Sequence, residues 1–420
     1  MDDDQYIIHD ISVSKGSLDI NDNQHNLIEK AGPRENIYFD PSKVRAGIVT
    51  CGGLCPGLND VIRALVMTLW YRYGTKHISG FMYGYRGFLS KFNHSVMELN
   101  PEIVSKIHSL GGTILGASRG YGDCVEEIVD SLEQMNINML FIIGGDGTQK
   151  GALEIAEEAK KRSLKISIVG IPKTIDNDLS FVDKSFGFET AVSRAVDAVS
   201  CAHVEAHDGV NGIGIVKVMG RESGFIAANT ALAINDVNYV LIPEVRFELE
   251  GENGLLSNLE RRLKQLNHAV ILVAEGAGQE YMKDSKAIDE SGNAKLNDIG
   301  VFLKERIGEY FKMRKIDINL KYIDPSYMIR SAPANSNDSV YCTKLGAYAV
   351  HAAMAGKTGM IVSFINSHFV HVPIRLTVSG RKRVDPHQEL WRDVIEATGQ
   401  PLLIQERRTK PRSEKARNAK

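Results

Sequence analysis

Two apolar runs in the chain each lead directly into a segment that is rich in glycine or aspartate. Residues 138–143 precede Gly-Gly-Asp-Gly-Thr at 144–148, and residues 165–171 precede Pro-Lys-Thr-Ile-Asp-Asn-Asp at 172–178. Short uninterrupted apolar runs are typical of buried parallel strands. Because α/β sheets bind ligands at the carboxyl ends of their strands, both polar segments are predicted to be ligand-binding loops.

Further apolar runs predict strands at 45–50, 212–219, 238–242 and 268–275, and apolar positions at helical spacing predict core-facing helices near 61–69 and 191–199. The first strand continues through a glycine-containing turn into the first helix. Gly52 and Gly53 in this turn would let backbone N–H groups approach an anion, although a tight turn explains them equally well. The alternation of strands and helices predicts an α/β fold with helix-covered parallel sheets.

The length of 420 residues predicts two domains, because a single core rarely exceeds about 250 to 300 residues. Residues 1–40 are polar and are interpreted as an N-terminal extension before the first strand of the core. Residues 281–297 are interpreted as a surface insertion. The end of the chain, residues 401–420, is interpreted as a basic tail that is not folded.

The composition narrows the class of protein. A net charge of -2 gives no overall attraction for nucleic acid or for an anionic membrane, and the longest apolar runs reach only half of a membrane span of about 20 residues. Residues 1–4 do not resemble a secretory signal, and five cysteines form no disulfide framework, so a cytoplasmic protein is expected. Cys51 and Cys55 leave a metal or redox pair as a minor alternative.

The segment 144–148 suits a phosphate donor and its metal. Gly144, Gly145 and Gly147 have no side chain to obstruct a polyphosphate, while Asp146 can reach a magnesium ion that bridges the donor phosphates. One protein carboxylate is sufficient, because magnesium keeps several of its waters. The alternative is a glycine-rich turn with a capping aspartate.

The segment 172–178 suits an alcohol acceptor. A sugar hydroxyl must lose its proton as the phosphoryl group arrives, and Asp176 is the predicted proton acceptor. Asp178 would support this base or contact the metal, and Thr174 would form a hydrogen bond with the substrate. An Asx-type turn, in which these side chains only bind neighbouring amides, is the alternative.

Cations are needed to hold two phosphorylated molecules. Arg119, Lys173, Arg221 and Arg330 are the candidates, and glycines beside Arg119 and Arg221 would permit close approach of a ligand. Glu275 follows an apolar run and is predicted to accept hydrogen bonds from sugar hydroxyls, or to cap a helix.

Taken together, six motifs in this order resemble the 6-phosphofructokinase family across residues 45–365. They are Thr-Cys-Gly-Gly-Leu-Cys-Pro-Gly-Leu-Asn at 50, Gly-Gly-Asp-Gly-Thr at 144, Pro-Lys-Thr-Ile-Asp-Asn-Asp at 172, Val-Met-Gly-Arg at 218, Ala-Glu-Gly-Ala at 274 and Tyr-Met-Ile-Arg at 327. The resemblance implies transfer of the ATP γ-phosphoryl group to the 1-hydroxyl of fructose 6-phosphate in glycolysis, in a homotetramer or homodimer. It also implies two similar α/β domains with the active site between them.

By position, the resemblance assigns residues to two subsites and places Asp146 on Mg²⁺. The donor site would comprise Gly52, Gly53, Arg119, Gly120, Gly145, Asp146, Gly147 and Thr148. The sugar-phosphate site would comprise Thr174, Ile175, Asp176, Met219, Gly220, Arg221, Glu275, Tyr327, Met328, Ile329 and Arg330. The donor domain would span 41–187 and about 338–380, and the sugar-phosphate domain would span 188–337 and about 381–400.

Gly147 and Lys173 bear on the identity of the donor. Family members that use pyrophosphate resemble this chain at Lys173 but carry aspartate where it has Gly147. A carboxylate at 147 would repel the α-phosphate of ATP, whereas glycine leaves the space open, so ATP is predicted and pyrophosphate is the alternative. The combination resembles the ATP-dependent enzymes of plants and trypanosomatids.

Two positions depart from the bacterial members of the family. Residues 211–213 and Asp338 with Ser339 stand where those members place phosphate-binding arginines, so the residues that hold the 6-phosphate are left open. Two further functions stay open at this point. A kinase of the Gly-Gly-Asp-Gly-Thr type could act on NAD or a lipid, and a regulatory subunit could bind nucleotide without catalysis.

Overall fold

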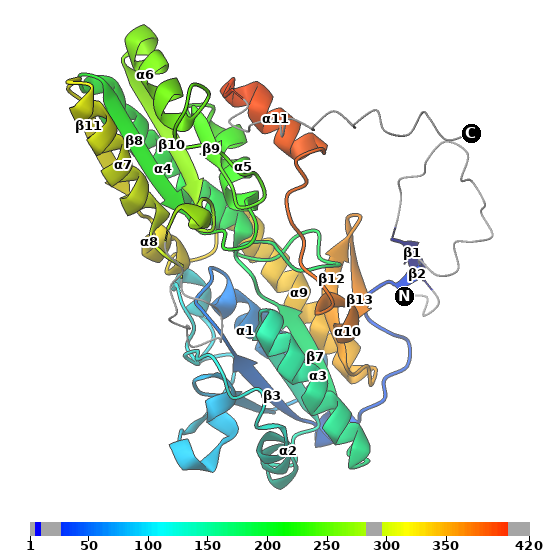
Figure 1. The fold of residues 1–420 in the computed structure, drawn as a ribbon. Helices are drawn as coiled ribbons and strands as arrows, with labels where there is room; N and C mark the ends of the chain where they lie inside the picture. Colours follow the sequence, from blue (N-terminus) through cyan, green and yellow to red (C-terminus); the bar gives the residue numbers. More distant parts are fainter. Residues whose placement is uncertain (1–4, 10–26, 283–295, 402–420) are drawn as a thin grey trace, which may run out of the picture.

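The computed structural model describes residues 5–9, 27–282 and 296–401. Two separate β-sheets, each placed between layers of helices, form the two halves of the molecule (Figure 1). The α/β fold class is therefore confirmed. Most of the expected surface insertion at 281–297 and the basic tail after Pro401 lie outside the described residues.

The larger sheet has seven strands in the order β13-β12-β7-β6-β3-β4-β5. The strands β3, β4, β6, β7 and β12 run parallel, while β5 and β13 are antiparallel to their neighbours. Strand β3 has β6 on one side and β4 on the other, so the chain changes direction across the sheet there, which is where such sheets bind ligands. The bounds are β3 (Arg45–Thr50), β4 (His77–Phe81), β5 (Val96–Glu98), β6 (Met139–Gly144), β7 (Ser167–Pro172), β12 (Met360–Ile365) and β13 (His368–Pro373).

Helices cover both faces of this sheet (Figure 1). The helices α1 (Leu58–Met67) and α9 (Ser336–Met354) pack against each other and enclose one core with the sheet. The helices α2 (Val125–Gln134) and α3 (Asp146–Lys161) enclose a second core on the opposite face.

The smaller sheet has four parallel strands in the order β11-β8-β10-β9. One face packs on α4 (Phe188–Asp208) and α5 (Phe225–Ile234), and the other packs on α6 (Leu255–Leu266) and α7 (Ile299–Met313). A short helix, α8 (Ser326–Arg330), follows β11. The strand bounds are β8 (Gly212–Val218), β9 (Tyr239–Leu241), β10 (His268–Ala274) and β11 (Asn319–Ile323).

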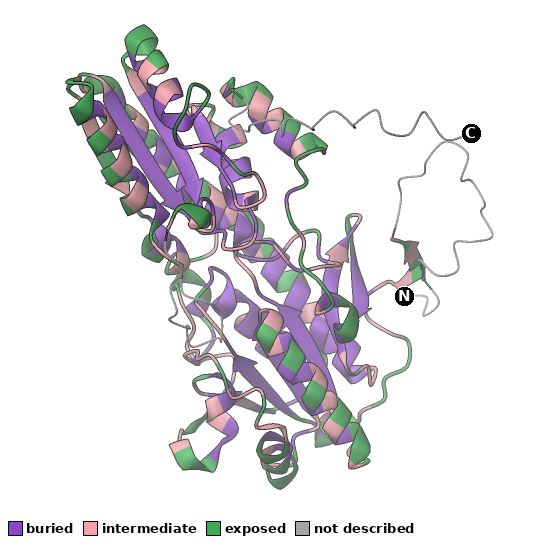
Figure 2. Cartoon of the chain, viewed as in Figure 1, coloured by how far each residue is buried: buried purple, intermediate pink, exposed green. Residues whose placement is uncertain are grey.

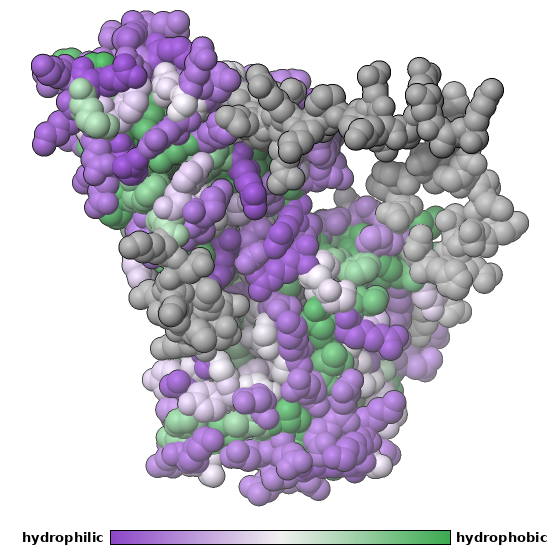
Figure 3. Space-filling view, in the orientation of Figure 1, coloured by the Kyte–Doolittle hydropathy of each residue, from purple (hydrophilic) through white to green (hydrophobic). Residues whose placement is uncertain are grey.

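Burial explains why the strands could be read from the sequence. Every residue of β6, β7 and β8 is buried, because helices cover both faces of each sheet (Figure 2). The predicted helical stripe of Ala191, Ala195 and Val199 has no exposed surface and faces the core from α4. By contrast, the ends of the molecule are largely hydrophilic (Figure 3).

The described part of the N-terminal extension contains two strands that its polar sequence does not predict. Strands β1 (Tyr6–Ile8) and β2 (Leu27–Glu29) form an antiparallel pair, and Lys30 continues this pairing to Val370 at the edge of the large sheet. Glu29 is held there by ion pairs of 2.8 Å to Lys357 and 2.9 Å to Arg34. The prediction that the first strand begins at 45 is therefore wrong, because edge pairing and ion pairs hold these short strands in place without a long apolar run.

After β13 the chain passes through α10 (Ile374–Thr377) beside the large sheet and then reaches α11 (Glu389–Thr398), which packs on α5 and β9 of the small sheet. The chain therefore crosses between the two halves again near its end. Among the described residues, no helix is both long enough and apolar enough to cross a membrane. The division into a donor domain and a sugar-phosphate domain stays a prediction.

Candidate active site

A cleft of about 780 Å³ lies where the strands of both sheets end. The loops after β3, β6 and β7 line it from the large sheet, and residues that follow β8 and β10 or end α8 line it from the small sheet. The two predicted loops lie side by side, since the N–H of Lys173 donates a hydrogen bond of 3.0 Å to the carbonyl oxygen of Gly144. The two loops therefore lie at the sheet edge where ligand binding is predicted.

The loop after β3 approaches the cleft through its backbone. Gly52 has a left-handed φ of 85°, and a Cβ there would lie 3.2 Å from Nζ of Lys173. The same Nζ donates a hydrogen bond of 2.8 Å to the carbonyl oxygen of Gly53. Glycine is therefore required at 52 both by the backbone conformation and by the close approach of the lysine.

The two cysteines of this loop do not behave as a reactive pair. Cys51 and Cys55 are free and buried, and burial raises the pKa of each thiol to about 12. Cys55 donates a hydrogen bond of 3.3 Å to the carbonyl oxygen of Phe186. Among the described residues, no group of three histidine, cysteine or acidic side chains could hold a metal ion. Packing accounts for both cysteines.

Helix α3 begins at Asp146, so this carboxylate lies where the partial positive charge of a helix start favours anions. Its Oδ2 is 2.9 Å from Nζ of Lys150, one turn later. The buried Gln149 donates hydrogen bonds to the carbonyl oxygens of Gly144 (3.0 Å) and Ile171 (3.3 Å), which ties the ends of β6 and β7 together. The alternative of a capping aspartate is not seen, because Gly145 is the N-cap of α3 and no side chain among the described residues caps this helix.

Gly147 is exposed in the first turn of α3, and a Cβ there would meet no atom within 4 Å. The position is therefore open toward the cleft. Lys173 on the next loop is buried, and desolvation is the main cause that lowers its pKa. The cleft is therefore lined by the buried side chain of Lys173, whereas no side chain extends into it from Gly147.

Asp176 has the properties of a proton acceptor. Its side chain is half-buried, and its Oδ1 has no exposed surface and no hydrogen-bond partner among the residues that the structure describes. Desolvation, followed by the charges of Asp178 and Glu275, raises the pKa of Asp176 to about 7. A carboxylate with a pKa near neutrality is well matched to general base catalysis.

The other polar residues of this loop hold it in shape. Oγ1 of Thr174 donates a hydrogen bond of 2.6 Å to Oδ1 of Asp178. Asn177 adopts a left-handed φ of 55°, and its side chain accepts a hydrogen bond from the N–H of Ser185 and donates one to the carbonyl oxygen of Asp183. The turn-forming role that the sequence left open therefore belongs to Asn177, while the carboxylate of Asp176 accepts a backbone hydrogen bond from Arg221 across the cleft lining.

The small sheet contributes Arg221, Glu275 and Arg330 to the lining. Burial raises the pKa of the Glu275 carboxyl, and the nearby charges of Arg330, Lys217 and Arg221 oppose this shift. Nε of Arg330 donates a hydrogen bond of 3.4 Å to Sδ of Met219, which directs the guanidinium along the end of β8.

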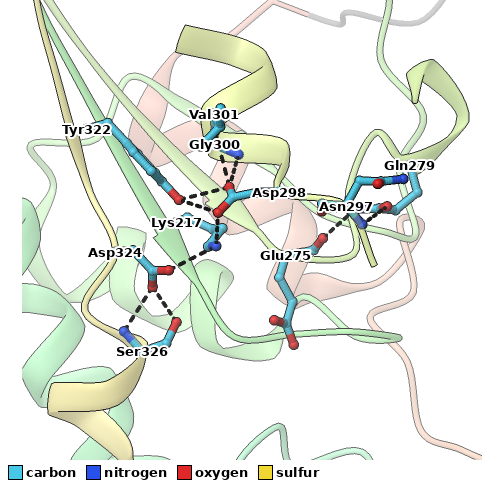
Figure 4. Close-up of polar contacts among 10 residues, drawn as sticks. All are labelled: Lys217, Glu275, Gln279, Asn297, Asp298, Gly300, Val301, Tyr322, Asp324 and Ser326. Atoms are coloured by element: carbon cyan, nitrogen blue, oxygen red, sulfur yellow. Dashed lines mark hydrogen bonds and ion pairs between the residues drawn. The ribbon is translucent and has the colours of Figure 1, made fainter. Parts of the chain in front are cut away.

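An ion cluster around the buried Lys217 lies next to these residues (Figure 4). Nζ of Lys217 lies 2.7 Å from Oδ2 of Asp298 and 2.9 Å from Oδ2 of Asp324. Asp324 also accepts hydrogen bonds from the backbone and side chain of Ser326, where α8 begins. The carboxylate of Glu275 points away from this cluster. Lys217 therefore joins β8 to the start of the helix that ends in Arg330.

Most of the predicted site residues line the cleft together: Gly52, Gly53, Arg119, Gly120, Gly145, Asp146, Gly147, Thr148, Lys173, Thr174, Ile175, Asp176, Asp178, Arg221, Glu275 and Arg330. Five others do not line it. Met219 and Ile329 are buried, Gly220 packs with a φ of 129° against Ser223, and Tyr327 and Met328 are 82% and 75% exposed. Their assignment to the sugar-phosphate site stays a prediction.

Several residues line the cleft that the sequence did not indicate, namely Tyr85, Ser118, Tyr121, Asp123, Lys150, Glu154 and Arg381. Lys150 could have been predicted, because residues four apart on a helix are neighbours and Lys150 lies four residues after Asp146. Arg381 had none, because it reaches the cleft from the last part of the described chain.

The two departures from the bacterial pattern have structural explanations. Asp338 is fully buried near the start of α9, and its Oδ2 accepts hydrogen bonds from the N–H (2.8 Å) and Oγ1 (2.6 Å) of Thr190 on α4. Asn211 has a left-handed φ of 48°, and its side chain donates a hydrogen bond to the carbonyl oxygen of Asp317. Both residues connect elements of the fold.

Comparison with known proteins identifies the family. The phosphofructokinase family model matches residues 45–353. The chain is 60% identical over 385 residues to an ATP-dependent 6-phosphofructokinase of Borreliella burgdorferi, which covers 90% of this chain and 86% of the relative. It is 48% identical over 375 residues to the ATP-dependent 6-phosphofructokinase of Trypanosoma brucei brucei, covering 89% and 76%.

A solved structure supports the fold. The pyrophosphate-dependent phosphofructokinase of Marinobacter aquaeolei superposes with a TM-score of 0.70 at 19% identity, over 86% of this chain and 92% of that chain. The six ordered motifs, the family match and the close relatives agree, and the chain belongs to the phosphofructokinase family.

Proposed function

We propose that this chain transfers the γ-phosphoryl group of ATP to the 1-hydroxyl of fructose 6-phosphate and so makes fructose 1,6-bisphosphate. The observation that carries the proposal is Asp176, a carboxylate with a pKa of about 7 in a cleft lined from both sheets. Relatives that are 48% to 60% identical and named ATP-dependent 6-phosphofructokinase support the substrates.

In the proposed reaction Asp176 accepts the proton of the 1-hydroxyl as that oxygen attacks the γ-phosphorus of ATP. The bond from the γ-phosphorus to the bridging oxygen breaks, and ADP leaves with the electron pair. Arg119, Lys173, Arg221 and Arg330 offset the charge on the phosphates, since all four line the cleft.

Asp146 fits a magnesium ion. Its carboxylate lies at the start of α3 between Gly145 and Gly147, so donor phosphates can approach it without steric obstruction. Magnesium takes one or two protein carboxylates and fills its remaining positions with phosphate oxygens and water. When bound, the ion would neutralise part of the donor charge, and Lys150 would give up its ion pair with Asp146.

ATP is favoured over pyrophosphate as the donor. Nothing lies within 4 Å of a Cβ at Gly147, so no side chain obstructs an α-phosphate, which ATP has and pyrophosphate lacks. The likeness to a pyrophosphate-dependent structure at 19% identity concerns the fold alone.

An NAD or lipid kinase and a non-catalytic subunit have less support. The family match over 45–353 argues against an NAD or lipid kinase, which would not need Arg221 and Arg330 in the cleft. Asp146 and Asp176 are both retained and face the same cleft, which argues against a subunit that binds nucleotide without catalysis. A homotetramer or homodimer and a cytoplasmic location are part of the proposal.

The proposal is tested with the variant Asp176→Asn. Loss of a general base is expected to lower kcat by about 10²- to 10⁴-fold while KM for both substrates changes little, because proton removal belongs to the transition state. Steady-state assays of fructose 1,6-bisphosphate formation would measure both parameters. Wild-type turnover in the variant would reject Asp176 as the base, and an inactive wild type would reject the substrate.

A further inference from the structure

A segment near the end of the described chain connects the two halves of the molecule beside the cleft. We call residues 380–384 the strap; it lies between α10 on the large sheet and α11 on the small sheet (Figure 1). Arg381 forms an isolated antiparallel bridge with Leu179, and the N–H of Lys382 donates a hydrogen bond of 2.8 Å to the carbonyl oxygen of Asp178. The strap is therefore paired with the chain immediately after the Asp176 loop.

Successive side chains of the strap have different partners, as expected for an extended segment. Arg381 lines the cleft. Lys382 donates hydrogen bonds to the carbonyl oxygens of Val182 (2.7 Å) and Asp183 (3.0 Å). Arg383 forms an ion pair of 2.6 Å with Glu222, which does not line the cleft. Among the residues of the strap, the cleft is lined by Arg381 alone.

Arg381 contacts the loop that bears the proposed base. Its Nη1 is 3.8 Å from Oδ2 of Asp178, and Oδ1 of the same carboxylate accepts the 2.6 Å hydrogen bond from Thr174. The side chain of Asp178 is only 13% exposed, and the charge of the neighbouring Lys382 also acts on it. Asp178 is therefore held on one side by its own loop and on the other by the strap.

The charges along the cleft indicate why this contact matters. Three carboxylates, on Asp176, Asp178 and Glu275, line the acceptor part of the cleft. Like charges in a partly desolvated site repel, so an unpaired Asp178 would be driven out of its present position. The Arg381 guanidinium supplies the opposite charge at Oδ2 of Asp178, the oxygen that does not accept the hydrogen bond from Thr174.

We propose that Arg381 is a positioning residue for phosphoryl transfer: it holds Asp178 in its hydrogen bond with Thr174 and so fixes the loop on which Asp176 faces the acceptor. Arg381 thus acts through Asp178. The inference rests on the proposed function, because positioning is measured through turnover. A direct contact between Arg381 and a substrate phosphate is the competing role, and the two predict different kinetics.

The test compares Arg381→Gln with the wild type in steady-state assays with ATP and fructose 6-phosphate. A positioning role predicts that kcat falls by about 10-fold or more while both KM values stay within about two-fold, because misplacement of the base affects the transition state. Arg381→Lys should recover part of the loss, since an ammonium can still pair with Asp178. The matched control is Arg383→Gln, which removes an arginine two residues away whose partner lies outside the cleft and should leave kcat unchanged.

A double-mutant cycle decides whether Arg381 acts through Asp178. In the background of Asp178→Asn, the further change Arg381→Gln should lower kcat by less than about two-fold, because the contact is already lost. Full additivity of the two effects, a raised KM with unchanged kcat, or wild-type kinetics in Arg381→Gln would each overturn the proposal.

Two controls keep the result interpretable. Arg381 is one third exposed, so its variants should unfold within about 3 °C of the wild type. Should Arg381→Gln unfold at a much lower temperature, the same kcat and KM comparison in Arg381→Lys decides the question. If the wild type itself does not turn over these substrates, the proposed function fails, which is a different outcome from wild-type kinetics in the variant.

Discussion

Asp176 is the residue at which function and stability oppose each other. Its raised pKa of about 7 means that the folded chain favours the neutral carboxyl, yet the proposed reaction requires the carboxylate. We therefore expect kcat/KM for fructose 6-phosphate to rise with pH and to level off above a midpoint near 7. Assays between about pH 5.5 and 8.5 would show this limb, and a flat profile across that range would contradict the assignment.

The same pKa shift predicts how stability depends on pH. A carboxyl whose pKa is raised on folding contributes stability below its unfolded pKa of about 3.9, and this contribution is lost as pH rises through about 7. Asp176→Asn should therefore melt at a higher temperature than the wild type at pH 8, and the difference should shrink at pH 5.5. Thermal unfolding at the two pH values measures the difference, and an equal gap at both would count against the shift.

Gly147 decides how much room the donor has. Because a Cβ at this position meets no atom within 4 Å, Gly147→Asp should fold normally, with an unfolding temperature within about 2 °C of the wild type. The added carboxylate should repel the α-phosphate, so kcat/KM for ATP should fall by at least about 10-fold. Gly147→Ala is the matched control, since it adds the Cβ without the charge and should lose much less activity.

At the scale of elements, the junction between α4 and α9 depends on one buried carboxylate. Asp338 accepts two hydrogen bonds from Thr190, and Asn335 donates its backbone N–H to the Thr190 hydroxyl. Asp338→Ala should lower the free energy of unfolding by about 2 to 3 kcal/mol, because it leaves buried donors without a partner. Denaturant unfolding measures this loss, and Val340→Ala, at an exposed position of the same helix, is the control.

The strands that could be predicted best from the sequence are those that are buried on both faces along their whole length. The strands at β6, β7 and β8 are buried on both faces and read as continuous apolar runs, so their position and the loops after them could be predicted. Edge strands behave differently. Strand β13 contains His368 and His371, and β1 and β2 have only three residues each, so local pattern did not reveal them.

The residues of the site likewise divide into those that could be predicted from the sequence and those that could not. Asp146 and Asp176 follow predicted strands, so their convergence follows from parallel topology. Arg381 reaches Asp178 only because the chain crosses between the two halves after β13, a tertiary contact that no local pattern encodes. Tyr327 and Met328 were assigned by resemblance alone, and because both side chains are exposed in the single chain, their role stays a prediction.

At the scale of the whole molecule, two sheets present their strand ends to one cleft, and phosphate donor and sugar acceptor would enter it from different halves. The proposed assembly as a homotetramer or homodimer gives a direct prediction. Light scattering coupled to size exclusion should give two or four times the chain mass of 46.4 kDa. A mass of one chain under assay conditions, with full activity, would show that the cleft is complete without a partner.

Transfer of a phosphoryl group from ATP to fructose 6-phosphate in this cleft can be tested with a single comparison of donors. It measures kcat/KM for ATP and for pyrophosphate with the same enzyme preparation at saturating fructose 6-phosphate. We expect turnover with ATP to exceed turnover with pyrophosphate by at least about 100-fold, because the open space at Gly147 accepts the larger donor. Turnover confined to pyrophosphate, or no fructose 1,6-bisphosphate with either donor, would contradict the proposed function.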